Sequence, residues 1–206
     1  MKHRVVTISR EFGSGGRTIG RELAARLGIP CYDEEVIEKL SERSGYSKEY
    51  IKERGEYAPA ATWIGSALAG RDRNGYSVAD SLWRVQSDLI QELAEQSPCV
   101  IVGRCADYLL RDRADCLTVF IHASMEFRAK RIVEVYGQRE ESPEKRLRDK
   151  DRRRRAYYQL YTDTRWGEAD NYHIALDSGV LGIGKCVDIL ADLYRNGKEN
   201  GKLFGS

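Results

Sequence analysis

The chain is poor in the residues that build disulfide frameworks and zinc sites. Its 206 residues include five cysteines at scattered positions, with no C-x-x-C pair, and three histidines without ligand spacing. This pattern excludes a disulfide-rich scaffold and argues against a structural zinc site. Unpaired thiols are typical of proteins in a reducing compartment, so we expect a cytoplasmic protein.

Long apolar runs and an excess of one charge are also missing. No run approaches the roughly 20 apolar residues that cross a bilayer, and residues 1–7 lack the pattern of a secretory signal. The 34 basic and 32 acidic side chains leave a formal net charge of +2. We therefore expect neither a membrane nor nucleic acid as a partner, and a charged ligand must bind at a local cluster.

Short apolar runs separated by amphipathic helical patterns are what the chain does contain. Hydrophobic residues make up 41% of it, enough for the core of one domain. The runs do not alternate with polar residues, which is typical of parallel strands covered by helices on both faces. The sequence therefore predicts a parallel α/β fold. Strands are expected at 4–9, 29–32, 99–103, 117–122 and 172–176, helices beginning near 18, 34, 77, 125, 142 and 183, short helices and loops at 44–76, and a frayed tail at the C-terminus.

The first expected strand leads into a glycine-rich loop, SREFGSGGRT (9–18). Glycines let backbone N–H groups turn inward around a phosphate, and the next helix adds the positive end of its dipole. Arg17 can reach outer phosphates, and the hydroxyl of Thr18 can hold Mg²⁺. The expected phosphate-binding residues are Gly13, Ser14, Gly15, Gly16, Arg17 and Thr18.

This loop fits the motif G-x-x-x-x-G-K-[ST] in two alternative ways. If Gly16 is the second glycine, Glu11 replaces the first and Arg17 replaces the lysine. If Gly15 is the second glycine, Arg10 replaces the first and Gly16 replaces the lysine. A flexible glycine-rich turn without a ligand is the plainer alternative.

An arginine-rich segment, SPEKRLRDKDRRRRAYY (142–158), predicts a second functional element. Ser142 as a cap and Pro143 in the first turn begin a helix. Four successive arginines point around most of a helical turn, so some of them face whatever the helix covers. Forked guanidinium groups suit a flap that closes over a phosphoryl group. We expect an arginine-bearing lid rather than a solvated face or a nucleic-acid patch.

With these segments in this order, the chain resembles the cytidylate kinase-like proteins, a branch of the P-loop nucleoside monophosphate kinases. The similar blocks are ISREFGSGGRTIG (8–20), IVGRCADYLL (101–110), FIHASMEFRAKRI (120–132) and the arginine-rich segment through RWGEADNYHIALDSGVLG (165–182). They span nearly the whole chain. The resemblance implies a three-layer P-loop NTPase fold with a parallel five-stranded sheet in a single domain over 1–206. It also implies a helical acceptor-binding insertion at about 44–76 and a lid at about 139–166.

The resemblance further implies roles for individual residues. The loop would bind the β- and γ-phosphates of ATP, with Mg²⁺ at Thr18 and Asp33. Arg104, in the Gly-Arg pair after the third strand, would hold the acceptor phosphate. The lid would direct arginines to the phosphates and an acid to the acceptor sugar. The expected catalytic residues are Arg17, Arg104, Arg148, Asp151 and Arg155.

The chain also departs from cytidylate kinases. Their loop carries a lysine that is missing here, and the aspartate that follows their Gly-Arg pair is Cys105 in this sequence. We therefore expect an ATP-dependent phosphotransferase for a small phosphorylated acceptor, with a nucleoside monophosphate as the first candidate. The alternatives are a nucleotide-binding regulatory module with weakened turnover and a kinase for a non-nucleotide small molecule. The sequence leaves the oligomeric state open.

Overall fold

The computed structural model describes residues 5–54, 78–113 and 115–196. Most of the expected acceptor-binding insertion at 44–76 and the C-terminal tail lie outside the described residues.

Five parallel strands form one sheet in the order β2-β3-β1-β4-β5. Every residue of the central strand and of its neighbour β3 is buried, as their unbroken apolar runs indicate. The chain builds the sheet first on one side of β1 and then on the other, so a crevice opens beyond the carboxyl end of β1. The strands are β1 (Val5–Arg10), β2 (Cys31–Tyr32), β3 (Cys99–Val102), β4 (Cys116–His122) and β5 (Ile174–Asp177).

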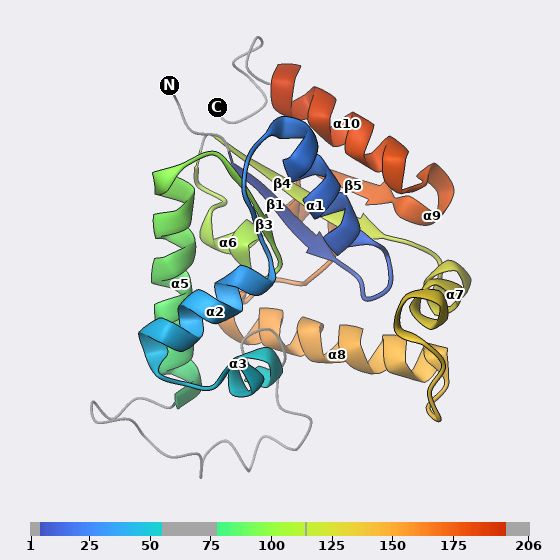
Figure 1. Cartoon of the computed structure of the whole chain (residues 1–206), viewed down its shortest axis with the longest axis horizontal. Helices are drawn as coiled ribbons and strands as arrows, with labels where there is room; N and C mark the ends of the chain where they lie inside the picture. Colours follow the sequence, from blue (N-terminus) through green and yellow to red (C-terminus); the bar gives the residue numbers. More distant parts are fainter. Residues whose placement is uncertain (1–4, 55–77, 114, 197–206) are drawn as a thin grey trace.

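Helices cover both faces of the sheet (Figure 1). On one face, α1 (Gly16–Leu27) and α10 (Ile183–Asn196) pack against the sheet through a core that includes Ile8, Leu23 and Leu190. On the other face, α5 (Val78–Gln96) and α6 (Ala106–Leu109) pack against β1 and β3. The predicted three-layer α/β architecture is therefore confirmed. The other helices within the described residues are α2 (Glu34–Ser44), α3 (Lys48–Arg54), α7 (Met125–Tyr136), α8 (Pro143–Thr162), α9 (Ser178–Leu181) and a 3₁₀ turn at Ala169–Asn171.

The arginine-rich segment forms the 20-residue helix α8. The hydroxyl oxygen of Ser142 accepts a hydrogen bond from the Lys145 amide, and Pro143 begins the helix, as the sequence predicts. In Figure 1, α8 lies beyond the carboxyl ends of the strands. An arginine cluster thus lies next to the glycine loop, although more than 120 residues separate the two in the sequence.

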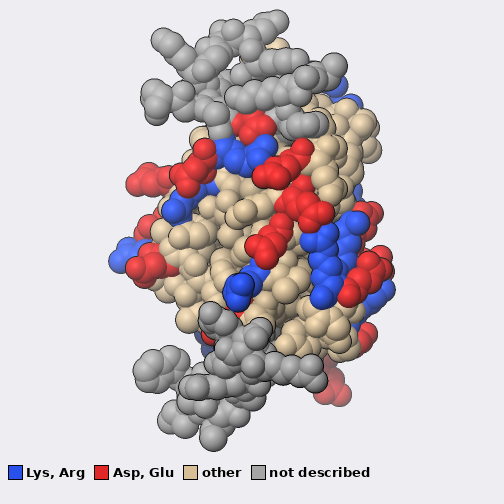
Figure 2. Space-filling model, turned by 90° about the vertical axis from the view of Figure 1, so that its left-hand side faces the viewer, with Lys and Arg blue, Asp and Glu red and all other residues tan. Residues whose placement is uncertain are grey.

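Charges of both signs are interspersed on the face shown in Figure 2. Arg43 of α2 pairs with Glu92 of α5, and Lys48 of α3 pairs with Glu38 of α2. The described residues on this face form no extended cationic surface. Within the described ranges, no helix is long and apolar enough to cross a membrane.

Candidate phosphate-binding site

The glycine loop connects β1 to α1 and is closely surrounded by side chains. Gly13 and Gly15 both have a φ of 83°, a conformation that favours glycine. A Cβ atom at Gly13 would lie 2.8 Å from Ile132 Cγ2, and one at Gly15 would lie 2.4 Å from Ile183 Cδ1. The chain therefore has both conformational and steric reasons for glycine at these two positions.

Ser14 fixes the loop from beneath. It is fully buried, and its hydroxyl donates to the carbonyl oxygens of Glu11 (2.9 Å) and Ile121 (3.1 Å). The hydroxyl of Ser178, at the start of α9, donates to the Ser14 carbonyl oxygen (2.6 Å). The side chain of Ser14 therefore holds the loop in place and points away from the cavity described next.

The structure also selects one of the two motif alignments. β1 ends at Arg10, Gly15 is the N-cap residue, and α1 begins at Gly16. In the arrangement strand–GxxxxGK[ST]–helix, Gly15 therefore takes the place of the second glycine. Arg10 then stands at the first glycine, Gly16 at the lysine and Arg17 at the serine or threonine. The hydroxyl of Thr18 comes one residue after the motif.

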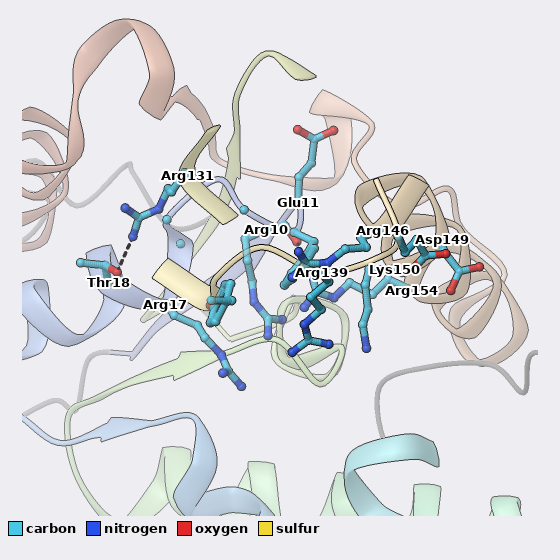
Figure 3. Close-up of a pocket in the computed structure, with 16 residues that line it drawn as sticks. Arg10, Glu11, Arg17, Thr18, Arg131, Arg139, Arg146, Asp149, Lys150 and Arg154 are labelled. Carbon is cyan, nitrogen blue, oxygen red and sulfur yellow. Dashed lines mark hydrogen bonds between the residues drawn. The ribbon is translucent and has the colours of Figure 1, made fainter. Parts of the chain in front are cut away.

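A cavity of about 350 Å³ opens over this loop, between α1, the end of α7 and α8 (Figure 3). Seven basic and only three acidic side chains line it. The amides at the N-terminus of α1 add positive potential at the loop. Such a cavity suits a polyanion. Its charged lining residues are Arg10, Glu11, Arg17, Arg131, Arg139, Glu141, Arg146, Asp149, Lys150 and Arg154.

One face of α8 supplies the lid cations to this cavity. Arg146, Lys150 and Arg154 recur every four residues and therefore share one side of the helix. Arg154 donates to the Arg10 carbonyl oxygen (3.2 Å). The structure does not bring Arg148 or Arg155 to the cavity.

The two expected lid arginines are exposed elsewhere on α8. The Arg155 guanidinium carbon lies 6.0 Å from the centre of the Trp166 ring, and Arg155 and Trp166 line a separate hollow. Arg148 projects to solvent.

Asp151 anchors α8 to the loop instead of facing the cavity. Its carboxylate accepts from the Phe12 amide (2.8 Å) and from Arg128 Nη1 (2.5 Å). Arg128 is 5% exposed, and its guanidinium also lies 3.3 Å from Glu11 Oε2. Burial raises the pKa of Glu11, against the lowering effect of Arg128. Arg128, which the sequence analysis missed, thus joins α7, α8 and the loop.

Thr18 and Asp33, expected at Mg²⁺, each contact an arginine. Arg131 Nη2 donates to Thr18 Oγ1 (2.9 Å), and Arg17 Nε lies 3.1 Å from Asp33 Oδ2. Both oxygens are of the hard type that Mg²⁺ prefers. Among the residues that the structure describes, no group of three or more His, Cys, Asp or Glu side chains could hold a metal. Mg²⁺ would therefore need phosphate oxygens as further ligands.

Arg104 lies outside this cavity, in an unusual turn after β3. Gly103, Arg104 and Cys105 have successive φ values of 76°, 62° and 55°, which strains the two residues other than glycine. Arg104 is 5% exposed, and its Nη1 lies 3.5 Å from the Gln86 Oε1 and Ile51 carbonyl oxygens. The turn therefore holds a buried cation at the carboxyl edge of the sheet, and its guanidinium makes long contacts to two neutral oxygens.

Comparison with known proteins identifies the family of this chain. Residues 5–180 match the model of the Cytidylate kinase-like family. The chain belongs to the cytidylate kinase-like family. No curated protein matches it. Membership of this family supports a phosphotransferase as the class of enzyme.

Several solved structures share the fold of this family member. An uncharacterized protein from Eubacterium ventriosum is 23% identical, with a TM-score of 0.70 over 94% of this chain and 99% of the other. Shikimate kinase from Acinetobacter baumannii, solved in complex with shikimate, is 16% identical, with a TM-score of 0.55 over 96% of both chains. A gluconokinase from Sinorhizobium meliloti is 16% identical, with a TM-score of 0.53 over 95% of this chain and 96% of the other. At these low sequence identities the similarity shows a shared fold and nothing about substrates. The predicted P-loop kinase fold is therefore confirmed.

Proposed function

We propose that the protein is an ATP-dependent kinase that moves the γ-phosphoryl group of ATP to a small phosphorylated acceptor. The observation that supports this most is the cationic cavity over the glycine loop. Its size, its excess of positive charge and its place at the N-terminus of α1 fit a triphosphate.

The donor would bind with its phosphates over the loop. The amides of residues 13–18 would donate to phosphate oxygens, and the inward cations of α8 would close the cavity from the other side. Bound ATP would supply the transferable phosphoryl group, and Mg²⁺ would neutralise part of the negative charge of the phosphates. Thr18 and Asp33 would hold the metal together with phosphate oxygens, while Arg17 stays close enough to balance the Asp33 carboxylate.

In this proposal the lid role belongs to Arg146, Lys150 and Arg154. Arg148 and Arg155 would reach the same phosphates only if α8 turned about its axis. The buried Arg128–Asp151 pair opposes such a turn. Asp151 would act as a positioning residue and Arg128 as its partner.

Arg104 would hold the phosphate of the acceptor at the neighbouring edge of the sheet. A phosphate could replace the long contacts of its guanidinium with bidentate ones. Since an acceptor phosphate is already anionic, the reaction needs no strong base from the protein. Positioning, electrostatic stabilisation and exclusion of water would supply most of the rate.

A nucleoside monophosphate is the first candidate for the acceptor, and one observation favours a non-nucleotide acceptor as the second. In cytidylate kinases, by the resemblance described above, the residue after the Gly-Arg pair is an aspartate that contacts the acceptor ribose. Here Cys105 is 6% exposed and packs with Phe120, Tyr157 and Trp166. A buried thiol is a poor partner for a ribose hydroxyl.

The test is ADP formation across a panel of acceptors: CMP, dCMP, UMP, AMP, sugar phosphates, shikimate and gluconate. We expect turnover with one class of phosphorylated acceptor. Arg104→Met should abolish transfer and leave ATP affinity within about 2-fold of the unchanged protein, because Arg104 lies outside the donor cavity. ATP binding without turnover on any acceptor would favour the regulatory module. Absence of ATP binding would contradict the proposal.

A further inference from the structure

The loop lacks the lysine of the conventional motif, yet the space that such a lysine would use is filled. A Cβ atom added to Gly16 would lie 2.5 Å from Arg10 Cβ and 2.8 Å from Arg10 Cγ. Real Cβ atoms do not approach other atoms so closely. The stem of Arg10 therefore occupies the place from which a side chain at residue 16 would leave the loop.

The two replacements depend on each other. A glycine at position 10 would remove the close contact and leave Ile121 Cβ at an ordinary 3.6 Å, whereas a lysine at position 16 would collide with Arg10. β1 ends at Arg10 and α1 begins at Gly16. In the motif, Arg10 therefore replaces the first glycine, and Gly16 replaces the lysine. The chain thus moves a basic side chain from the end of the loop to its beginning.

Arg10 is well placed to act on a ligand of the cavity. It lines the cavity although its residue exposure is only 4%, so little water screens its charge. In Figure 3 the guanidinium groups of Arg10, Arg17 and Arg139 extend to the same side of the loop. The other basic candidate of the loop, Arg17, is 40% exposed and contacts Asp33 and Glu34.

We propose that Arg10 supplies the loop cation of this protein and binds the terminal phosphates of the donor in place of the missing lysine. This inference rests on the proposed function and names a further residue of the same site. A guanidinium keeps its charge at every accessible pH and can bind two phosphate oxygens at once. Arginine at this position therefore performs the task of the lysine with a different geometry.

The test measures the affinity of the full chain for ATP and for inorganic tripolyphosphate by titration calorimetry. Arg10→Met should weaken both about 10- to 100-fold, because it removes a charge-assisted contact from a buried site. Arg10→Lys should retain part of the affinity. Arg26→Met, a matched change at the other end of α1 where Arg26 pairs with Asp188, should leave both affinities unchanged within about 2-fold.

A reciprocal exchange makes the test independent of how well Arg10→Met folds. Gly16→Lys alone should lose ligand affinity, because the new side chain collides with Arg10. The double variant Arg10→Gly with Gly16→Lys restores the glycine and the lysine of the conventional motif and should regain at least about 10-fold over Gly16→Lys alone. Arg10→Gly with Gly16→Met relieves the same collision without restoring a cation and should not regain this affinity, so a rescue by lysine alone shows that the two positions share one task.

Two results would overturn the inference. The first is unchanged tripolyphosphate affinity in Arg10→Met; if stability falls at the same time, Arg10 would be assigned to its interaction with Asp107 instead. The second is a double variant no better than Gly16→Lys. Failure of the unchanged protein to bind ATP or tripolyphosphate is a separate outcome, since it would remove the proposed function together with this inference.

Discussion

Both sides of helix α8 carry basic side chains, but the two sides lie in different surroundings. The inward side presents Arg146, Lys150 and Arg154 to the cavity, and the outward side leaves Arg148 and Arg155 exposed. Two buried anchors distinguish the sides. Asp151 binds Arg128 and the Phe12 amide near the middle of the helix, and Tyr158 donates to Asp107 (2.7 Å) further along. The anchors, more than the arginine run, therefore decide which cations face the cavity.

Removal of the first anchor should have the largest effect. Asp151→Ala leaves Arg128 buried with Glu11 as its remaining carboxylate partner, so we expect the free energy of unfolding to fall by about 3 kcal/mol. Glu134→Ala is the control, because the exposed Lys130–Glu134 pair should contribute less than about 0.5 kcal/mol. Urea unfolding followed by circular dichroism measures both. Equal losses in the two variants would contradict the role of Asp151 as an anchor.

The second anchor makes stability depend on pH. Burial raises the pKa of Asp107 to about 6, so between about pH 4 and pH 6 the folded state binds more protons at this group than the unfolded state. The contribution of Asp107 to stability therefore falls as pH rises through this window. Asp107→Asn keeps an acceptor for the Tyr158 hydroxyl and cannot ionise. As the pH rises from about 4 to about 7, the free energy of unfolding of Asp107→Asn should increase by up to about 3 kcal/mol relative to that of the unchanged protein.

The measurement is the free energy of unfolding of both proteins at the two ends of that window. Identical pH dependence in the two proteins would show that Asp107 is already ionised at low pH. The second anchor would then be an ordinary charged hydrogen bond.

A third pair of variants compares the two sides directly and should have the smallest effect. Lys150→Met should weaken tripolyphosphate binding about 10-fold, because Lys150 lines the cavity. Arg148→Met, two residues earlier on the outward side, should change the affinity less than about 2-fold. Calorimetric titration at one fixed salt concentration measures both. The reverse order would show that α8 binds its ligand in a different rotation.

Local patterns were enough to predict the sheet and the loop. The apolar run at 99–103 and the glycines at 13–16 specify a buried strand and a tight loop before a helix through neighbouring residues alone. The cap at Ser142 was also predicted, because its signal lies within four residues.

The rotation of α8 was harder to predict. Leu147 and Tyr158 mark its buried stripe, and Arg154 falls on the same side, so part of the signal was present in the sequence. By resemblance to the cytidylate kinase lid, Asp151 was expected to act toward the acceptor sugar, and in the structure its carboxylate binds Arg128 of α7. Its partner Arg128 lies 23 positions away, on a different helix. Long-range pairing of this kind is set by tertiary packing, which periodicity does not encode.

The most direct test of the account is a crystal structure of the protein with Mg²⁺ and a non-hydrolysable ATP analogue. The account expects the triphosphate over the glycine loop, with its oxygens within hydrogen-bond distance of the loop amides and of the inward cations of α8. A triphosphate bound in the hollow beside Arg155 and Trp166, with the loop cavity empty, would contradict it.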